Sequence, residues 1–174
     1  LAELLDLSGI QNVIARTDSN IASVASIDDA KEYLKGKLVE SYDVLPVIIK
    51  DLLVSSCCVK LSSPTLPEYS MLLFPDLRAL EGALKVKLVG YGLYTDDEDY
   101  GIGTFFDISK NVISLDKKYH DKITDGEKMI QYLESGYTFL RTHRNSLFHM
   151  NDFVESSRKI DTLDKALSLS DDSY

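Results

Sequence analysis

Residues 136–152 read GYTFLRTHRNSLFHMND and place basic, amide and imidazole side chains on a segment with helical periodicity. The apolar side chains that recur at helical spacing on and before this stretch are Ile130, Leu133, Tyr137 and Leu140. Such a stripe predicts an amphipathic helix that buries one of its faces. We expect this helix to start at the Thr124-x-x-Glu127 pattern, which has the form of a capping box.

The course of the chain after Arg144 has two interpretations. Leu133, Leu140, Leu147 and Val154 lie seven residues apart, which favours one continuous helix. Asn145 is also a suitable N-cap, so a new helix can begin there instead. A continuous helix would place Arg141, Asn145 and His149 on one stripe that faces away from the apolar one.

Helical patterns also occupy most of the chain before this segment. We expect a helix from Asp28 to Pro46 with Ser26 as its cap, followed by a buried, mostly apolar helix over residues 47–58. A third helix should start at Pro75 and close at Gly90 or Gly92. Its apolar stripe consists of Leu77, Leu80, Leu84 and Leu88. A last amphipathic helix is expected over residues 160–169.

Two short β-type runs interrupt the helical pattern in FFDISKNVISL, residues 105–115. We expect a β-hairpin insertion near 104–116 between two helices. The predicted fold class is therefore mostly α, a helical bundle with a small β-hairpin insertion. Residues 28–174 should form this domain, and residues 1–27, which include the run TDSNIASVAS, should be a linker or the end of an upstream domain.

Composition narrows the classes of function. The 174 residues are 44% hydrophobic and 27% charged, as in a water-soluble globular domain. Twenty-eight acidic against 19 basic residues give a net charge of −9, which argues against a broad basic face for nucleic acid. Any RNA-binding site must therefore be small and local. No apolar run approaches the length of a membrane span, so we expect no association with a membrane. The adjacent Cys57-Cys58 pair does not have the spacing of a zinc site, and we expect neither a metal nor a cofactor. Two cysteines without a disulfide pattern fit a cytoplasmic protein.

The strongest candidate for chemistry is Arg144-Asn-Ser-Leu-Phe-His149. An imidazole can move protons near neutral pH, and a guanidinium can hold an anionic phosphate beside it. If Asn145 starts a new helix, the helix N-terminus adds attraction for phosphate. The alternative is a solvated polar face with an incidental histidine.

A second candidate is Arg78-Ala-Leu-Glu81 on the third helix. Glu81 can reach both Arg78 and Lys85 along the helix, so the simplest interpretation is a surface ion pair. The functional interpretation is a second phosphate-binding arginine across the bundle from residues 144–149, with a carboxylate that orients either this arginine or a catalytic histidine.

The pattern R-N-x-x-x-H at 144–149 resembles the R-x(4–6)-H signature of the HEPN superfamily, in which a polar residue often follows the arginine. FPDLRALEGALK, then a hairpin, then GYTFLRTHRNSLFHMND resembles the C-terminal domain of the RNase LS-type toxins, the RnlA and LsoA family. The resemblance covers about residues 25–174. It implies a HEPN-like helical bundle and a metal-independent endoribonuclease toxin without a cofactor. It also implies a toxin-antitoxin system in which a protein antitoxin, and in some cases a phage-encoded inhibitor, blocks the enzyme.

Residue by residue, the resemblance implies that Arg144 and His149 are the catalytic pair and that Arg78 and Glu81 support them. Arg141 and Asn145, which share the stripe with His149, are expected to bind the RNA substrate. A nuclease without a metal or a nucleophilic side chain must use the 2′-hydroxyl of RNA.

The motif offers one histidine per chain, but this cleavage requires both an acid and a base. We therefore expect a homodimer whose two active sites meet at a two-fold interface. The alternative function is a non-catalytic HEPN-like helical module that binds a protein partner.

Overall fold

The computed structural model describes residues 25–93, 101–109, 112–152 and 154–174. Its helices are α2 (Ile27–Leu38), α3 (Glu40–Val44), α4 (Val47–Leu61), α5 (Phe74–Gly90), α6 (Glu127–Phe148) and α7 (Leu163–Asp172). The strands β1 (Phe106–Ser109) and β2 (Val112–Leu115) pair antiparallel, with Phe106 opposite Leu115. Short 3-10 helices are η1 (Ser70–Leu73), η2 (Ile102–Phe105), η3 (Lys117–Lys122) and η4 (Val154–Ser156). The predicted mostly helical fold with a small β-hairpin is confirmed.

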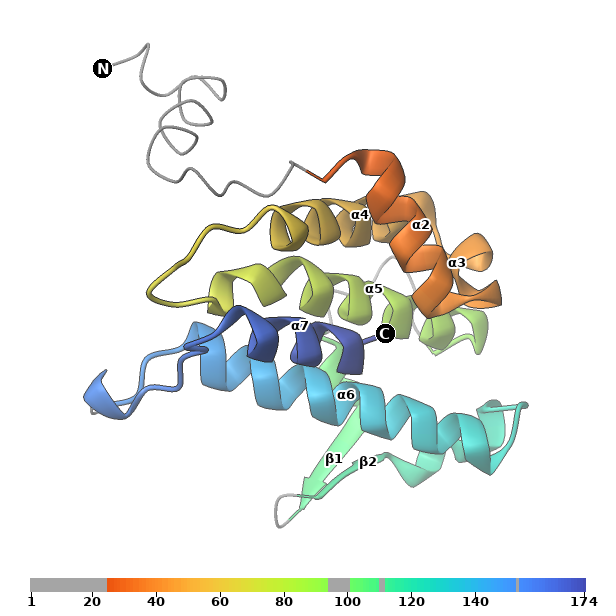
Figure 1. Cartoon of the computed structure of the whole chain (residues 1–174). Helices are drawn as coiled ribbons and strands as arrows, with labels where there is room; N and C mark the ends of the chain where they lie inside the picture. The colour runs from red at the N-terminus through yellow and green to blue at the C-terminus, as the bar shows by residue number, and fades with distance from the viewer. Residues whose placement is uncertain (1–24, 94–100, 110–111, 153) are drawn as a thin grey trace, which may run out of the picture.

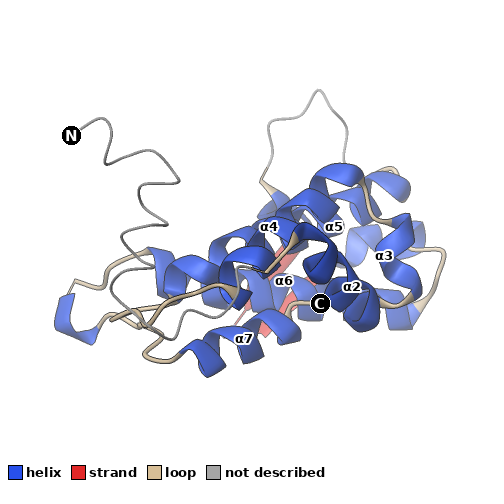
Figure 2. Ribbon diagram, turned by 45° about the horizontal axis from the view of Figure 1, so that its top comes forward, coloured by secondary structure: helices blue, strands red, loops and turns tan. Residues whose placement is uncertain are grey.

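Helices α4, α5 and α6 lie side by side in this order, with α2 packed on α4 (Figure 1). The hairpin packs through β2 against α6, and Figure 2 shows that these two strands stand among elements that are otherwise helical. Across the described ranges, no helix is long and apolar enough to cross a lipid bilayer. The linker predicted before residue 28 lies almost entirely outside the described residues.

Helix α5 is the wall between two hydrophobic clusters. Its Ala79 packs into the cluster formed by α2, α3 and α4, which also contains Leu34 and Leu53. Its Leu77, Leu84 and Leu88 belong to the larger cluster, together with the predicted stripe of α6. Burial on both sides leaves α5 little freedom to shift, since either cluster would lose packing.

Helices α5 and α6 run antiparallel and approach closely. A Cβ atom added at Gly136 of α6 would lie 3.1 Å from Cδ2 of Leu84 on α5, so the glycine permits this approach. Near one end Phe74 contacts Phe148, and near the other Tyr91 donates a hydrogen bond to Asp125 at 2.6 Å. The N-terminal half of α5 therefore faces the C-terminal end of α6.

Several predicted helix boundaries are confirmed by the structure. Ser26 caps α2 in a full capping box with Asp29, and Pro75 stands in the first turn of α5. The helix predicted over residues 47–58 extends to Leu61.

The last helix starts later than predicted, at Leu163, because the Thr162 side chain accepts a hydrogen bond from the Lys165 N–H.

Other boundary predictions were wrong. The helix expected from Asp28 to Pro46 breaks at Val39, whose φ of 49° ends α2 and turns the chain so that Tyr42 is buried. Thr124 does not cap α6, because Gly126 at φ 78° is the N-cap and makes Glu127 the first helical residue. Helix α6 continues through Asn145 without a break, so no new helix begins there.

A buried ion pair joins α4, α5 and the C-terminal helix. Lys60 Nζ lies 2.6 Å from Asp76 Oδ2, and both side chains are almost completely buried. Lys60 also donates hydrogen bonds to Ser170 and, at 3.3 Å, to the Tyr174 hydroxyl. Burial, together with the negative charge of Asp76, raises the pKa of Tyr174, so its hydroxyl stays protonated. Helix α7 is thereby tied to the two central helices.

The segment that follows α6 is held to the same bundle by Arg158. Its Nη1 lies 3.2 Å from His143 Nδ1 and 3.1 Å from Ser146 Oγ. Burial, and then the nearby positive charge of Arg158, lower the pKa of His143. A neutral imidazole at this position can accept the guanidinium's hydrogen bond, whereas a protonated one cannot.

Replacing Lys60 with Met should destabilise the protein strongly. The change would leave Asp76 buried without its cation, which costs about 3–5 kcal/mol in the free energy of unfolding. Urea denaturation of both variants would measure the effect. Lys165→Met is the matched control, because its pair with Asp161 is exposed and should contribute less than about 1 kcal/mol. Equal losses in the two variants would contradict the structural role of the buried pair.

The lowered pKa of His143 predicts a pH-dependent stability. Below about pH 6.5 the unfolded chain takes up a proton at this side chain before the folded chain does, so stability should fall as pH falls. In His143→Gln the loss between pH 7.5 and 5.5, measured by urea denaturation, should be smaller than in the wild type. Arg158→Gln should be intermediate, since burial of the ring remains. Equal pH dependence in all three proteins would contradict the assignment.

Candidate functional site

The antiparallel packing of α5 on α6 brings the two predicted groups of polar residues together. Arg78 and Glu81 lie on α5, Arg144 lies in the last turns of α6, and His149 follows that helix directly. His149 is the C-cap, with an extended backbone at φ −122° and ψ 135°. The predicted polar stripe of α6 therefore ends at Asn145. The position of the His149 imidazole is set by the backbone conformation at the C-terminus of the helix.

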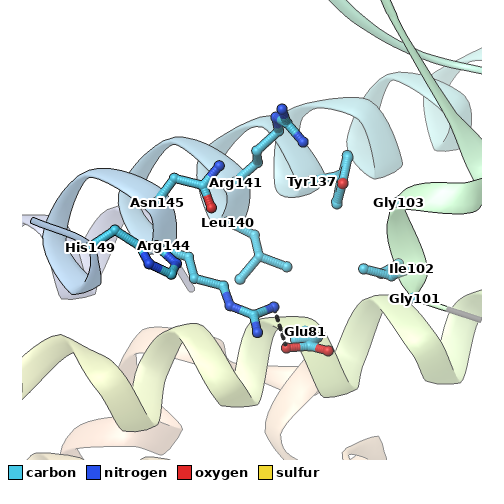
Figure 3. Close-up of a pocket in the computed structure, with 10 residues that line it drawn as sticks. All are labelled: Glu81, Gly101, Ile102, Gly103, Tyr137, Leu140, Arg141, Arg144, Asn145 and His149. Atoms are coloured by element: carbon cyan, nitrogen blue, oxygen red, sulfur yellow. Dashed lines mark hydrogen bonds and ion pairs between the residues drawn. The ribbon is translucent and has the colours of Figure 1, made fainter. Parts of the chain in front are cut away.

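Glu81 connects the two helices. Its Oε2 lies 3.5 Å from Arg144 Nη1 (Figure 3). Its Oε1 lies 2.8 Å from Lys85 Nζ. The predicted surface pair with Lys85 and a cross-helix ion pair thus exist together. A separation of 3.5 Å is long for a hydrogen bond, so the contact with Arg144 is mainly electrostatic and orients the guanidinium without locking it.

A first cavity of about 320 Å³ opens between α6 and η2. Figure 3 shows its lining residues, with Arg144 extending from α6 toward Glu81 and Arg141 extending away from it. The polar side chains that line it are Glu81, Tyr137, Arg141, Arg144, Asn145 and His149. Arg141 and Asn145, predicted to bind substrate, therefore share a cavity with the predicted catalytic pair.

A second cavity of about 390 Å³ lies between the N-terminal half of α5 and the end of α6. Arg78, Arg144 and His149 all line it. Its other lining residues are Phe74, Leu77, Glu81, Leu140 and Phe148. Four of the six predicted site residues, Arg78, Glu81, Arg144 and His149, are thus brought together, while Arg78 does not reach the first cavity.

A third cavity of about 350 Å³ adjoins the segment after α6 and is also lined by His149. Arg158 and Lys159 contribute positive charge there, beside Glu68 and Glu155. His149 is exposed and lines all three cavities. The attraction for phosphate expected from a helix N-terminus at Asn145 is absent, because this is the C-terminal end of α6.

Some lining residues were not identified from the sequence. Gly101 and Gly103 form a wall of the first cavity. A Cβ atom at Gly103 would lie 2.6 Å from the Tyr137 hydroxyl, so the glycine allows η2 to approach α6. The role of Gly103 follows from this contact with Tyr137, which joins residues that are distant in the sequence.

His143 does not line any of these three cavities. Its ring packs against Phe139, with centroids 4.2 Å apart, and lines a separate hollow with Glu134 and Thr138. Within the described ranges, no three His, Cys, Asp or Glu side chains gather in a group that could hold a metal ion. The arrangement around His149 can bind an anion and exchange a proton with it.

Comparisons with known proteins identify the family of this chain. The model of the family described as "RNase LS, bacterial toxin DBD domain" matches residues 27–151. The mRNA endoribonuclease toxin LS of Escherichia coli strain K12 is 39% identical over 160 residues, which are 92% of this chain and 44% of that protein. The chain thus spans less than half the length of this relative.

The fold is also similar to that of a solved toxin. The crystal structure of Escherichia coli toxin LsoA in complex with T4 phage antitoxin Dmd aligns with a TM-score of 0.73 and 21% identity. The alignment covers 98% of this chain and 65% of that one. Together with the match over residues 27–151, these findings identify the chain as a member of the RNase LS bacterial toxin DBD domain family.

Proposed function

We propose that residues 28–174 form the catalytic domain of an endoribonuclease toxin of the HEPN type. The observation that carries the proposal is that Arg78, Arg144 and His149 line one cavity, although they come from opposite sides of the α5–α6 interface. The similarity to an mRNA endoribonuclease toxin supports RNA as the substrate. Residues 1–27 are proposed to be a linker or the end of a preceding domain.

The side chains around the cavity suit cleavage by the substrate's own 2′-hydroxyl. In this reaction the 2′-oxygen attacks phosphorus, the bond to the 5′-oxygen breaks, and a 2′,3′-cyclic phosphate and a 5′-hydroxyl remain. His149 either takes the proton from the 2′-hydroxyl or gives one to the leaving 5′-oxygen. Arg144 and Arg78 bind the phosphate and stabilise the charge that develops on it, so a metal ion is not required.

Glu81 is a positioning residue in this proposal. Its side chain is only 24% exposed and holds Arg144, which is 56% exposed, by an ion pair. Arg144 would otherwise sample many rotamers at this exposed position. Arg141 and Asn145 line the adjoining cavity and are proposed to bind the RNA on one side of the cleaved bond.

Complete acid-base catalysis requires a second proton-transfer group. His143 is turned away from the cavity, and His120 lies near the Leu115 carbonyl, with 3.1 Å between the ring Nε2 and that oxygen. We therefore propose a homodimer in which a second copy supplies the second His149. Such a two-fold arrangement gives each phosphate one imidazole from either chain.

The proposed partners follow from the same reasoning. An enzyme of this kind must be held inactive in its own cell, and we propose a protein antitoxin in the cytoplasm as the inhibitor. The similar LsoA structure contains a phage antitoxin, which supports a phage-encoded inhibitor and a role in phage defence as well.

A non-catalytic, HEPN-like module that only binds a protein partner remains the alternative function. The exposed imidazole beside two arginines in one cavity favours the enzyme, since a binding module needs no group for proton transfer.

His149→Ala and Arg144→Ala in the full-length gene product should each slow RNA cleavage in EDTA by at least about 100-fold. Loss of the imidazole removes acid-base catalysis, worth about 10²–10⁴-fold in rate. Loss of the guanidinium removes transition-state stabilisation worth about 10²–10³-fold. Single-turnover assays with end-labelled RNA would measure both rates, and the products should carry cyclic phosphate.

His143→Gln at pH 7.5 is the matched control, because this histidine lies on the same helix outside the cavity. Its cleavage rate should equal that of the wild type. Cleavage that persists unchanged in His149→Ala and Arg144→Ala would disprove the proposed site. A wild-type protein that is silent even as a dimer, yet binds its antitoxin, would support the non-catalytic alternative.

A further inference from the structure

Two phenylalanines stand at the edge of the site without an assigned role. Phe74 is the first residue of α5 and Phe148 the last of α6, so the antiparallel packing places them together. Their ring centroids are 5.6 Å apart and their planes are perpendicular. Phe74 is 55% exposed, so its ring contributes little to the core. An edge-to-face pair leaves broad ring surface free for a third flat group.

The cavity beside this pair has the size and composition of a small-ligand site. Its volume of about 390 Å³ falls in the range of about 300–1,000 Å³ typical of such sites. Leu77 and Leu140 add apolar surface to the two rings, while Arg78, Arg144 and His149 add the polar groups. Apolar and anion-binding surfaces therefore lie next to each other in one cavity.

A nucleotide in single-stranded RNA has the matching arrangement, because a flat base is joined through its sugar to a phosphate. Proteins hold such bases by stacking them on aromatic rings and arginine planes. We propose that Phe74 and Phe148 form a base-binding subsite for the nucleotide adjacent to the cleaved phosphate. The inference rests on the proposed ribonuclease function and adds to it a group that positions the RNA.

The location favours a base over an apolar protein surface. The rings share their cavity with two guanidinium groups and an imidazole, which a purely apolar partner would leave buried without partners. A base that stacks here brings its own phosphate within the same cavity as the cations. Stacking on Phe74 would thus orient the 2′-hydroxyl for attack.

Phe74→Leu and Phe74→Trp in the full-length gene product separate stacking from apolar burial. Binding would be measured by fluorescence anisotropy in a His149→Ala background, with a short RNA that spans a cleavage site mapped with the wild-type protein. Phe74→Leu should weaken binding about 5- to 20-fold, since base stacking on one aromatic ring typically has this effect or a larger one. Phe74→Trp should bind as well as the parent protein or better.

The same RNA with an abasic nucleotide beside the cleaved bond tests the contact directly. The missing base should weaken binding to the parent protein but cause no further loss in Phe74→Leu. Tyr132→Leu is the matched control, because this tyrosine is 57% exposed on α6 and lines a different cavity, so RNA binding should not change. Thermal melting would establish that each variant is folded.

Three outcomes would overturn the inference. If Phe74→Leu binds RNA like the parent while cleavage still depends on His149, the subsite is wrong and the proposed function stands. If Phe74→Leu leaves RNA binding intact but weakens the complex with the antitoxin or a second copy, the rings form a protein-docking surface. If wild-type protein neither binds nor cleaves RNA, the proposed function fails and the subsite fails with it.

Discussion

The close antiparallel contact of α5 with α6 is the constraint on which the candidate site depends. The contacts along its length are Phe74 with Phe148, Glu81 with Arg144, Leu84 with Gly136, and Tyr91 with Asp125. A slip of one helical turn would move one helix by about 5.4 Å and separate Glu81 from Arg144. Because α5 is packed against a hydrophobic cluster on each side, such a slip would disturb both clusters at once. The core thus fixes the distance between charges at the surface.

Patterns within a single helix could be predicted from the sequence, because they reflect local spacing. The stripe Ile130, Leu133, Tyr137 and Leu140 is buried as predicted, and the capping box at Ser26 forms. Boundaries that depend on one backbone conformation could not be predicted. Val39 adopts a positive φ that its β-branched side chain disfavours, and Gly126 displaces the cap expected at Thr124. Both residues are exposed, so the periodicity of apolar residues gives no sign of either conformation.

The site was predictable only in part for a related reason. The motif at 144–149 could be identified from its arginine and histidine alone. No local pattern connects it with Arg78 and Glu81, which lie more than 60 residues away in the sequence. A family resemblance supplied that link, and the structure places the four residues together. The walls formed by Phe74, Phe148 and Gly103 carried no chemical signal of their own, because apolar residues and glycines also serve ordinary packing.

The net charge of −9 is compatible with binding an RNA phosphate at this place. Around His149 the cavities collect Arg78, Arg141, Arg144, Arg158 and Lys159 against Glu68, Glu81 and Glu155, five cations against three carboxylates and thus a local excess of two. Exposed charges farther than about 8 Å are largely screened at physiological ionic strength. Phosphate therefore responds mainly to this local excess, while the acidic remainder disfavours binding elsewhere on the surface. In the proposed function, this distribution directs the RNA phosphate to the cavities that His149 lines.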